Sequence, residues 1–368
     1  MDLLIESLSR AGYNIDLLTF NEGDGRNHPN LTIYRVGNLL KFSNIRPGFS
    51  ARKLVLDVVM FFHMVRLLAG KRYRVIHAVE ESAFIAMVLG FVFRTPFIYD
   101  MDSSLATQMI DKYPSLSTIE KPLRWIESLP IRRACAVIPV CDALKNLALR
   151  YRSDDLYLLK DISLLDKSCS LGSTPAVDNL REIGDPSSDI LLYIGNMEPY
   201  QGIDLLLESF ALAVDGKADL KLIVIGGAND DVNKYKNLAN NLGIAEKAYF
   251  LGPRPLEFLN AYCLQAKLLV SPRVYGENTP MKIYSYLDSG IPVLATRLPT
   301  HTEVMNDGNS FLAEPNSEAF AGAIVEVFAD YDAALSRANV AAALIAQEHS
   351  KTAFSKRAMS IYKSLFGA

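Results

Sequence analysis

The feature that most constrains this chain is a regular alternation of short apolar, β-branched runs with amphipathic stretches of helical period. This alternation is typical of parallel sheets whose strands are joined by covering helices. Strands are expected at 14–20, 31–36, 75–79, 96–100, 136–140, 156–159, 190–194, 220–225, 248–251, 268–271, 292–295 and 310–313. Helices are expected at 51–68, 82–93, 120–128 and 142–150. The pattern therefore predicts an α/β protein with doubly wound sheets.

The length of 368 residues suits two domains rather than one. Residues 166–188 are rich in Ser, Gly, Pro and Asp, which predicts a linker. A first domain over 1–165 and a second over 189–345 follow, and in each the ligand is expected at the carboxyl edge of the sheet. The final helix, within 346–368, carries an apolar stripe that we expect to pack back on the first domain.

The composition excludes several classes of protein. Hydrophobic residues make up 50% and charged residues 21%, which predicts a globular chain, and the net charge of −3 gives no basis for nucleic-acid binding. The four cysteines are spaced for neither zinc nor a disulfide framework, which favours incidental thiols in a reducing cytoplasm. No apolar run reaches the ~18 residues of a bilayer span. Asp2 and Glu6 stand where a signal peptide would be basic.

The start of the chain departs from the usual order. Residues 1–11 already have the pattern of an amphipathic helix, with Leu4 and Leu8 on its apolar face. A doubly wound domain normally opens with a strand and a glycine turn before this helix. The sequence therefore predicts a first domain with a truncated or shifted start.

A strand, a glycine loop and a helix follow one another around Gly195 and Gly202. The predicted strand ends at Gly195, a loop runs to Gly202, and apolar residues of helical spacing follow. The free N–H groups of a helix amino terminus can cradle a phosphate. The same order also fits an ordinary tight connection between strand and helix, so both interpretations stand.

A second segment, residues 271–296, combines a strand, a polar loop and a helix. Asn278 or Thr279 is expected to cap this helix, with Pro280 in its first turn. Glu277 would then lie at the mouth of the helix amino terminus, where a carboxylate can accept hydrogen bonds from sugar hydroxyls. Lys282, one turn further, would offer a cation to a phosphate.

These segments resemble the retaining, GT-B-fold glycosyltransferases of family 4, the glycosyl transferase group 1 family. The resemblance covers nearly the whole chain and is clearest over 190–315. It implies two Rossmann-like domains facing across a cleft, a nucleotide-diphosphate sugar as donor, and no metal or other cofactor. The family has two glutamates separated by seven residues, which fall on Glu277 and Ser285 here. The resemblance implies that Glu277 contacts the donor sugar and that Ser285 contacts the nucleotide ribose.

The chain departs from this family at the glycine loop. An arginine and a lysine that pair with the donor diphosphate are replaced by Asn196 and Gln201. A close cation–phosphate pair is worth on the order of a few kcal/mol. Lys282, Arg273 or Arg254 would supply replacement charge, and this predicts a divergent enzyme. A non-catalytic relative that binds a nucleotide sugar or a partner is the alternative.

In the first domain, Asp102 stands at or near a family histidine beside the transferred sugar. It could accept a hydrogen bond from a sugar hydroxyl, or be a plain carboxylate at a strand end. Asp100 and Asp102 also match a D-x-D metal motif, which this fold does not need. His77 and Glu80 would face the acceptor; a core histidine and a solvated helix start fit them equally.

Basic residues surround two apolar stretches of the first domain. Arg66 and Lys71 flank the expected helix 51–68, and Arg124 and Arg132 lie near Trp125. Such a stripe either packs on the sheet or lies on an anionic membrane surface. The expected activity is transfer of a hexose to a saccharide or lipid-linked acceptor, in cell-surface polysaccharide or glycolipid synthesis. It is expected in the cytoplasm, at the inner face of the plasma membrane.

Overall fold

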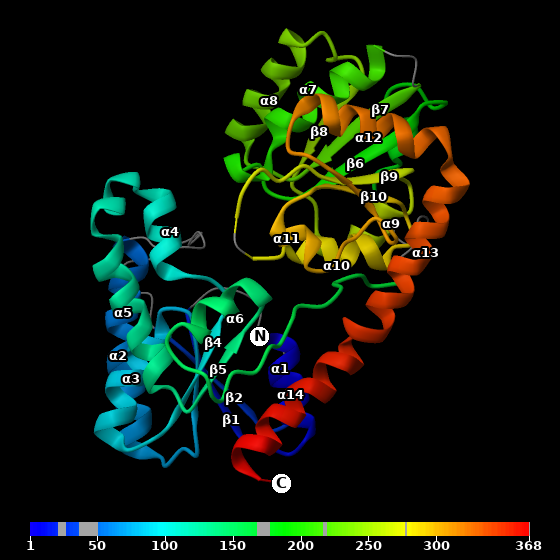
Figure 1. Ribbon diagram of the computed structural model, residues 1–368. Helices are drawn as coiled ribbons and strands as arrows, with labels where there is room; N and C mark the ends of the chain where they lie inside the picture. Colours follow the sequence, from blue (N-terminus) through cyan, green and yellow to red (C-terminus); the bar gives the residue numbers. More distant parts are fainter. Residues whose placement is uncertain (21–26, 37–50, 168–176, 216–218, 277, 368) are drawn as a thin grey trace. The chain divides into compact units, whose positions relative to one another are not determined.

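The computed structural model describes residues 1–368 apart from 21–26, 37–50, 168–176, 216–218, 277 and 368. The chain forms two compact units (Figure 1). The first comprises Met1–Lys160 and Phe354–Ala368, and the second comprises Asp161–Ala353. Eleven of the expected strands are present, and the prediction of a twelfth at 156–159 is wrong, because only an isolated bridge joins Leu156 to Val137.

The first unit contains two parallel sheets. The larger has the order β3-β4-β5, with β3 (Ile76–Val79), β4 (Phe97–Met101) and β5 (Ala136–Pro139). The smaller pairs β1 (Ile15–Thr19) with β2 (Leu31–Arg35). Each strand of the larger sheet is reached through helices, as a parallel sheet requires.

Helices cover both faces of the larger sheet. On one face the core is formed with α3 (Ser82–Phe93), α5 (Glu120–Arg133) and α6 (Asp142–Leu149), and α2 (Ala51–Gly70) packs beside α3. On the other face lie α1 (Asp2–Arg10) and α14 (Lys351–Phe366), whose Leu4 and Ile361 pack near Ile98. Two short helices, α4 (Leu105–Lys112) and the 3₁₀ helix η1 (Pro114–Ile119), lead from β4 to α5.

The second unit is a six-stranded parallel sheet with the order β11-β10-β9-β6-β7-β8. Its strands are β6 (Asp189–Ile194), β7 (Leu220–Ile225), β8 (Ala248–Gly252), β9 (Leu268–Ser271), β10 (Val293–Thr296) and β11 (Phe311–Ala313). The chain winds outward from β6 to β8, then returns to place β9 on the other side of β6. The direction of winding thus reverses between β6 and β9, and a doubly wound sheet binds its ligand at this point.

Two helical layers enclose this sheet. The core on one face includes α7 (Ile203–Asp215), α8 (Asn229–Asn241) and α12 (Ser317–Ala329). The core on the other includes α9 (Leu259–Cys263), α10 (Met281–Asp288) and α13 (Tyr331–Glu348). Part of the segment expected as a linker also packs here, since Leu180 of the 3₁₀ helix η2 (Leu180–Glu182) is fully buried in the second core.

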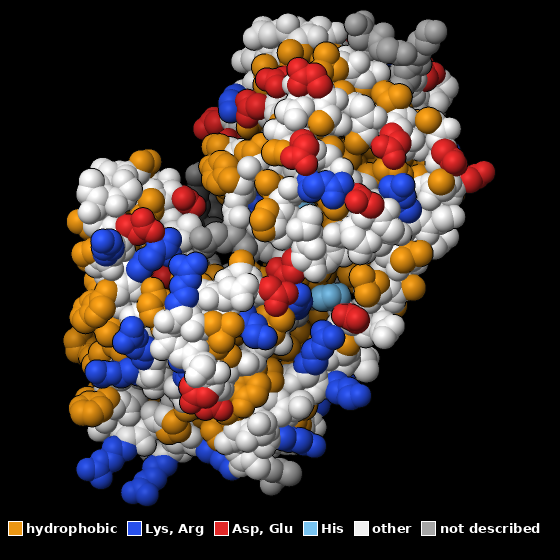
Figure 2. Space-filling view, viewed as in Figure 1, with side chains coloured by type: hydrophobic (Ala, Val, Ile, Leu, Met, Phe, Trp, Pro, Cys, Tyr) orange, Lys and Arg blue, Asp and Glu red, His pale blue; other side chains and the backbone are white. Residues whose placement is uncertain are grey.

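Charge is divided unevenly between the two units. The first contains 24 Lys and Arg against 16 Asp and Glu, a net charge of +8, whereas the second contains 14 against 25, a net charge of −11. Figure 2 shows the blue side chains gathered mainly over the first unit. Among the residues that the structure describes, no helix has both the length and the hydropathy needed to cross a bilayer.

Candidate functional site

The two segments singled out in the sequence follow the two strands at which the winding of the second sheet reverses. Gly195 comes directly after β6, and the polar loop 272–280 comes directly after β9. Because β6 and β9 are parallel neighbours, their carboxyl ends lie at the same edge of the sheet. The fold of the second unit alone therefore brings both segments to one place.

The glycine loop is held against the segment after β9. Gly202 ends the 3₁₀ helix η3 (Pro199–Gln201) with φ +71°, a left-handed conformation that favours glycine. A Cβ on Gly202 would collide with the carbonyl oxygen of Pro272. The amide of Val274 donates to the carbonyl of Tyr200 over 3.0 Å. Glycine at 202 is thus needed for both its conformation and its close contact.

Lys282 of α10 reaches into this loop. Its ammonium donates to the side-chain oxygen of Gln201 over 2.9 Å and lies 4.0 Å from the centre of the Tyr193 ring. A Cβ on Gly195 would lie 3.2 Å from Nζ of Lys282, so the absence of a side chain at 195 leaves space for the ammonium. Burial, and then the charge of Arg273, holds the pKa of Lys282 well below its usual value. A bound oxyanion beside Lys282 would favour the charged amine and so raise the pKa again, against both effects.

The side chain of Arg273 holds the loop after β9 in place through hydrogen bonds. Its Nε donates to the carbonyl of Tyr275 and its Nη1 to that of Asn278, each over 2.8 Å. The Asn278 side chain also accepts from Nη2 at 3.3 Å, and the guanidinium lies over the Tyr200 ring. Arg273 is 6% exposed and burial lowers its pKa. It fixes the residues on either side of 277 by its contacts with their backbone.

The start of α10 corrects one expectation. Neither Asn278 nor Thr279 caps the helix: it begins at Met281, with Pro280 in extended conformation at the cap position. The Thr279 hydroxyl instead donates to the Glu303 carboxylate over 2.9 Å. Glu277, the expected contact to the donor sugar, lies outside the described residues.

Ser285 is fully buried in the middle of α10. Its hydroxyl oxygen accepts the amide of Leu164 over 2.9 Å, which ties α10 to the segment at the start of the second unit. This geometry favours a structural role. The contact to a ribose that the resemblance implies stays a prediction.

Arg254 is held in an ion pair with the segment before β6. Its Nε lies 2.6 Å from the Asp178 carboxylate, and its Nη1 donates to the carbonyl of Leu251 over 2.6 Å. The hydrogen bond from Arg254 lowers the pKa of Asp178. Arg254 therefore fastens this segment to the loop after β8. Within the described part of the chain, Lys282 is the one of the three replacement cations whose side chain donates a hydrogen bond to the glycine loop.

Two acceptor-side candidates, Glu80 and Asp102, come directly after β3 and β4 at the carboxyl edge of the first sheet, whereas His77 lies inside β3. His77 is held on both ring nitrogens, by Asp100 at 3.0 Å and by the Tyr362 hydroxyl at 2.7 Å. Glu80, with φ +48°, accepts from the Ser103 hydroxyl over 2.9 Å. Asp102 is exposed. The contacts of His77 are those of a histidine that joins β3, β4 and α14.

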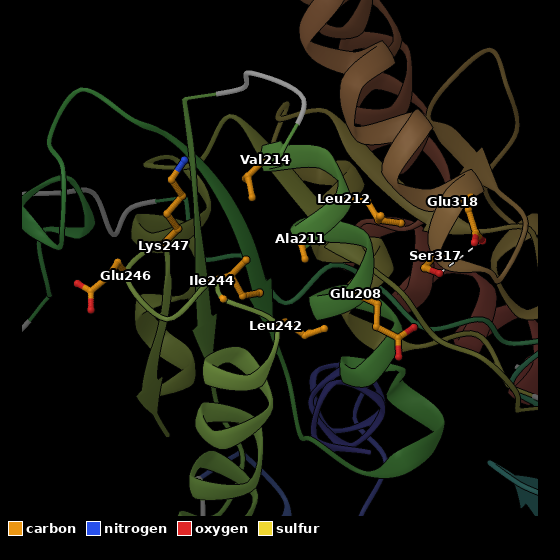
Figure 3. A pocket seen from close by; sticks show the side chains of 11 residues that line it. Glu208, Ala211, Leu212, Val214, Leu242, Ile244, Glu246, Lys247, Ser317 and Glu318 are labelled. Carbon is orange, nitrogen blue, oxygen red and sulfur yellow. Dashed lines mark hydrogen bonds between the residues drawn. The ribbon is translucent and has the colours of Figure 1, made fainter.

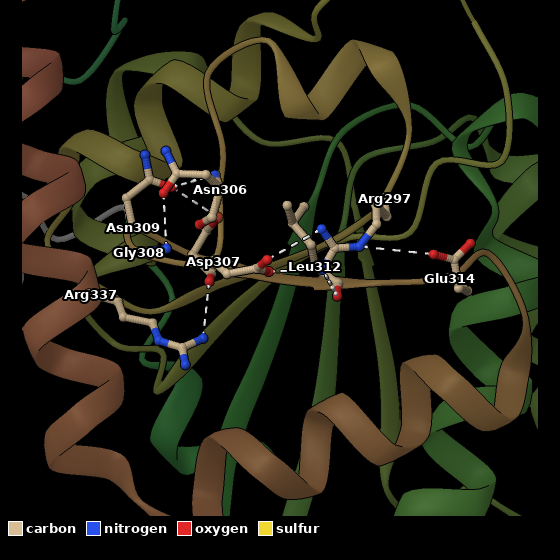
Figure 4. A network of polar contacts seen from close by, with 9 residues as sticks. Arg297, Asn306, Asp307, Gly308, Asn309, Leu312, Glu314 and Arg337 are labelled. Atoms are coloured by element: carbon tan, nitrogen blue, oxygen red, sulfur yellow. Dashed lines mark hydrogen bonds and ion pairs between the residues drawn. The ribbon is translucent and has the colours of Figure 1, made fainter.

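Two other features of the second unit are separate from this site. Figure 3 shows a hollow lined by Leu212, Ile244 and Ser317, where α7 ends and α12 begins, at the opposite edge of the sheet. Figure 4 shows a polar network in which Arg297 binds Asp307 over 2.8 Å. That network fixes the chain between β10 and β11.

Sequence reasoning missed the tyrosines of the site. The Tyr193 hydroxyl donates to the carbonyl of Asn196 over 2.6 Å, and its ring lies beneath the Lys282 ammonium. Tyr286 binds the backbone of Ile194 with its hydroxyl. An aromatic residue in a buried strand or helix predicts only core packing, so neither gave a usable signal. The pairing of Thr279 with Glu303 gave none either, because 24 residues separate them.

Comparisons with known proteins agree with this architecture. The model of the glycosyl transferases group 1 family matches residues 180–343, and that of the glycosyl transferase 4-like domain matches residues 2–155. A D-inositol 3-phosphate glycosyltransferase of Corynebacterium aurimucosum is 28% identical over 150 residues, or 38% of this chain and 35% of that protein. The chain thus spans about a third of the length of this relative. An uncharacterized glycosyltransferase of Methanocaldococcus jannaschii is 22% identical over 373 residues, 98% of this chain and 92% of that one.

Solved structures show the fold. Sucrose-phosphate synthase from Thermosynechococcus elongatus superposes with a TM-score of 0.75 at 18% identity, covering 99% of this chain and 92% of that one. Anabaena HepE, in complex with UDP and glucose, gives a TM-score of 0.74 at 18% identity, covering 98% and 95%. The fold is therefore GT-B, with two Rossmann-like domains.

Proposed function

We propose that this chain, whose two parts match the models of the glycosyl transferase 4-like domain and of the glycosyl transferases group 1 family, transfers a hexose from a nucleotide-diphosphate sugar. The HepE structures, one with UDP and glucose and one with UDP-glucose, support a donor of this class. The proposed acceptor is a saccharide or a lipid-linked sugar. The proposed process is synthesis of a cell-surface polysaccharide or glycolipid at the inner face of the plasma membrane.

One observation carries the proposal: the part-buried ammonium of Lys282 at the loop between Gly195 and Gly202. The family has cations at 196 and 201, where this chain has Asn196 and Gln201. Lys282 places a cation against the same loop from the neighbouring segment. A diphosphate bound there would be stabilised by the charge of Lys282 and by hydrogen bonds from the side-chain amides of Asn196 and Gln201. The N–H groups at the amino end of α7 would also donate to it.

The proposed reaction uses this arrangement to stabilise the leaving group. As the glycosidic bond breaks, negative charge develops on the diphosphate, and preorganised donors beside it lower the barrier. Glu277 would orient the sugar through its hydroxyls, in the role that the resemblance gives it. Attack from the face of the leaving group, with the phosphate oxygen taking the acceptor proton, would retain the anomeric configuration without a metal.

The acceptor is proposed to bind at the carboxyl edge of the first sheet. Asp102 is exposed there and is the candidate to accept a hydrogen bond from a sugar hydroxyl. His77 and Glu80 are already engaged with Asp100 and Ser103, so they would shape this edge through those contacts.

A second candidate is a non-catalytic relative that binds a nucleotide sugar or a partner. The burial of Ser285 and its bond to Leu164 favour it, because the ribose contact of the family is replaced by an internal one. Turnover separates the two candidates.

The test is to incubate the protein with UDP-, GDP- and ADP-hexoses and to measure released nucleoside diphosphate. Proton NMR of the product gives the anomeric configuration. The proposal predicts release that is lost in Glu277→Gln and kept in Lys247→Met, an exposed lysine at the opposite edge of the same sheet. Binding without turnover would support the second candidate. No binding of any of the three nucleotides would overturn the transferase proposal and leave, of the second candidate, only a relative that binds a partner.

A further inference from the structure

Helix α3 is apolar on every side, yet it lies at the surface. Its sequence, SAFIAMVLGFVF, has no charged residue. A surface helix normally has one apolar face, and a helix apolar all round is normally enclosed. Here Phe91 is 82% exposed, Val92 63% and Val88 49%. This exposed apolar surface needs a partner.

The neighbouring helices extend the same surface. Helix α3 contacts both α2 and α5, and the three lie side by side in Figure 1. Val58 and Phe62 of α2 are exposed, as are Trp125 and Ile126 of α5. We call these residues, with Val88, Phe91 and Val92, the outer helical face. Three helices that cover one face of the first sheet thus expose large apolar side chains together.

Basic side chains border the outer helical face. Arg66 follows Phe62 by one helical turn, Arg94 directly follows α3, and both are exposed. Lys121 and Arg132 of α5 are exposed as well. Of the acidic residues on α5, Glu127 is buried and Glu120 is paired with Arg124. This border belongs to the unit of net charge +8.

We propose that the outer helical face docks on an anionic phospholipid surface. An apolar surface bordered by arginine and lysine suits the boundary between headgroups and acyl chains. The 12 residues of α3 extend about 18 Å, short of the ~30 Å of a hydrocarbon core, so the helix would lie in the interface. The membrane contact itself does not depend on the proposed function. Only its purpose does, which would be to bring the chain to a lipid-linked acceptor.

Charge argues against a second copy of the chain as the occupant. In a two-fold dimer the same patch meets itself, so the basic border of one copy would meet the basic border of the other. Like charges brought together in this way oppose association. An anionic lipid surface instead complements both the apolar side chains and the basic border.

The chain contains its own probe of this contact. Trp125 is the only tryptophan in the sequence, and it is 61% exposed on the outer helical face. The full-length protein would be titrated with vesicles of phosphatidylcholine alone and of phosphatidylcholine with 30% phosphatidylglycerol. A blue shift of the fluorescence with the anionic vesicles, and quenching by lipids brominated on their acyl chains, is the expected result. High salt should weaken the binding.

Paired substitutions identify the surface. Phe91→Gln with Val92→Gln should lower the vesicle partition coefficient at least tenfold, because both side chains enter the apolar layer. Arg66→Gln and Arg94→Asn should each lower it about fivefold. Asparagine suits position 94, where φ is +55°. The control is Leu256→Gln, which changes a 61% exposed leucine of the second unit and should leave the partition coefficient unchanged.

Three outcomes would overturn the proposal. Trp125 fluorescence could stay unchanged with anionic vesicles, or binding could be equal for neutral and anionic vesicles. Sedimentation could also reveal a dimer that Phe91→Gln with Val92→Gln dissociates, which would assign the surface to a second copy. Nucleotide binding measured on the same samples reports the donor site separately, so failure of the membrane contact is distinct from failure of the proposed function.

Discussion

The ammonium of Lys282 and the side-chain oxygen of Gln201 are 2.9 Å apart, although 81 residues separate them in the chain. One comes from the helix after β9 and the other from the loop after β6. The parallel pairing of these strands produces the contact. The second unit thereby holds a part-buried cation at the edge where a doubly wound sheet binds its ligand.

This contact predicts that nucleotide binding takes up protons. Burial lowers the pKa of Lys282 from 10.5, so the free protein holds this group partly deprotonated in the alkaline range below that value. A bound diphosphate favours the charged form and raises the pKa again. Calorimetry at alkaline pH, in buffers of different ionisation enthalpy, should show proton uptake that is lost in Lys282→Met and kept in Lys247→Met. Equal uptake in both variants would contradict the assignment.

Replacing Ser285 by alanine should lower stability and leave nucleotide affinity nearly unchanged. The change leaves the part-buried amide of Leu164 without its acceptor, at a cost of about 1 kcal/mol. Urea unfolding followed by circular dichroism measures the loss. Ser336→Ala, at an exposed site on α13, should change stability by less than about 0.5 kcal/mol. A large loss of nucleotide affinity in Ser285→Ala with unchanged stability would restore the ribose role.

The buried side chain of His301 should lower the stability of the second unit in acid. The side chain is fully buried between Ser271 and Thr296, and this burial lowers its pKa from 6.5 to about 3. Between these values the unfolded chain binds a proton that the folded chain does not, so stability falls as the pH falls. His301→Gln should reduce the slope of unfolding free energy against pH in this window by about 1.4 kcal/mol per pH unit. An unchanged slope would show that His301 is charged in the fold.

Tyr362→Phe should destabilise the first unit by about 1 kcal/mol, because it removes a hydrogen bond to His77 that joins α14 to β3. Trp125 lies in the first unit, so its fluorescence reports the unfolding of that unit in urea. Tyr157→Phe removes exposed hydroxyl contacts with Asp155 and with Ser364 of α14 and serves as the control, with an expected change of less than about 0.5 kcal/mol. Equal effects of the two changes would mean that the bond to His77 contributes nothing.

The sequence predicted the strands well because their signal is local. A parallel strand buried on both faces is a short apolar run, as in 190–194 and 268–271, and both became strands. The run 156–159 is equally apolar, and its Tyr157 and Leu159 amides donate to carbonyls of β5, but it forms an isolated bridge between Leu156 and Val137 and no strand. Whether such a run becomes a strand depends on its pairing with a neighbouring strand, and the local sequence does not show that pairing.

The candidate site was predictable as a place but not as a set of contacts. Spacing identified the loops at Gly195 and after Ser271, because a strand, a loop and a helix follow in order. Which cation donates a hydrogen bond to the glycine loop depends on what the other two bind: Asp178, 76 residues away, holds Arg254, and the nearby carbonyls of Tyr275 and Asn278 hold Arg273. The contacts of Arg254 with Asp178 and of Lys282 with Gln201 join residues far apart in the sequence, and only the folded chain shows them.

The most direct test of the account is the affinity of the full-length protein for nucleoside diphosphates, measured by titration calorimetry with UDP, GDP and ADP. At least one should bind, and Lys282→Met should weaken that binding about 10- to 100-fold, since a charge-assisted hydrogen bond contributes about 1.5–3 kcal/mol. Lys247→Met should bind as tightly as the unaltered chain. Equal affinity of Lys282→Met and the unaltered chain would place the diphosphate elsewhere and contradict the account.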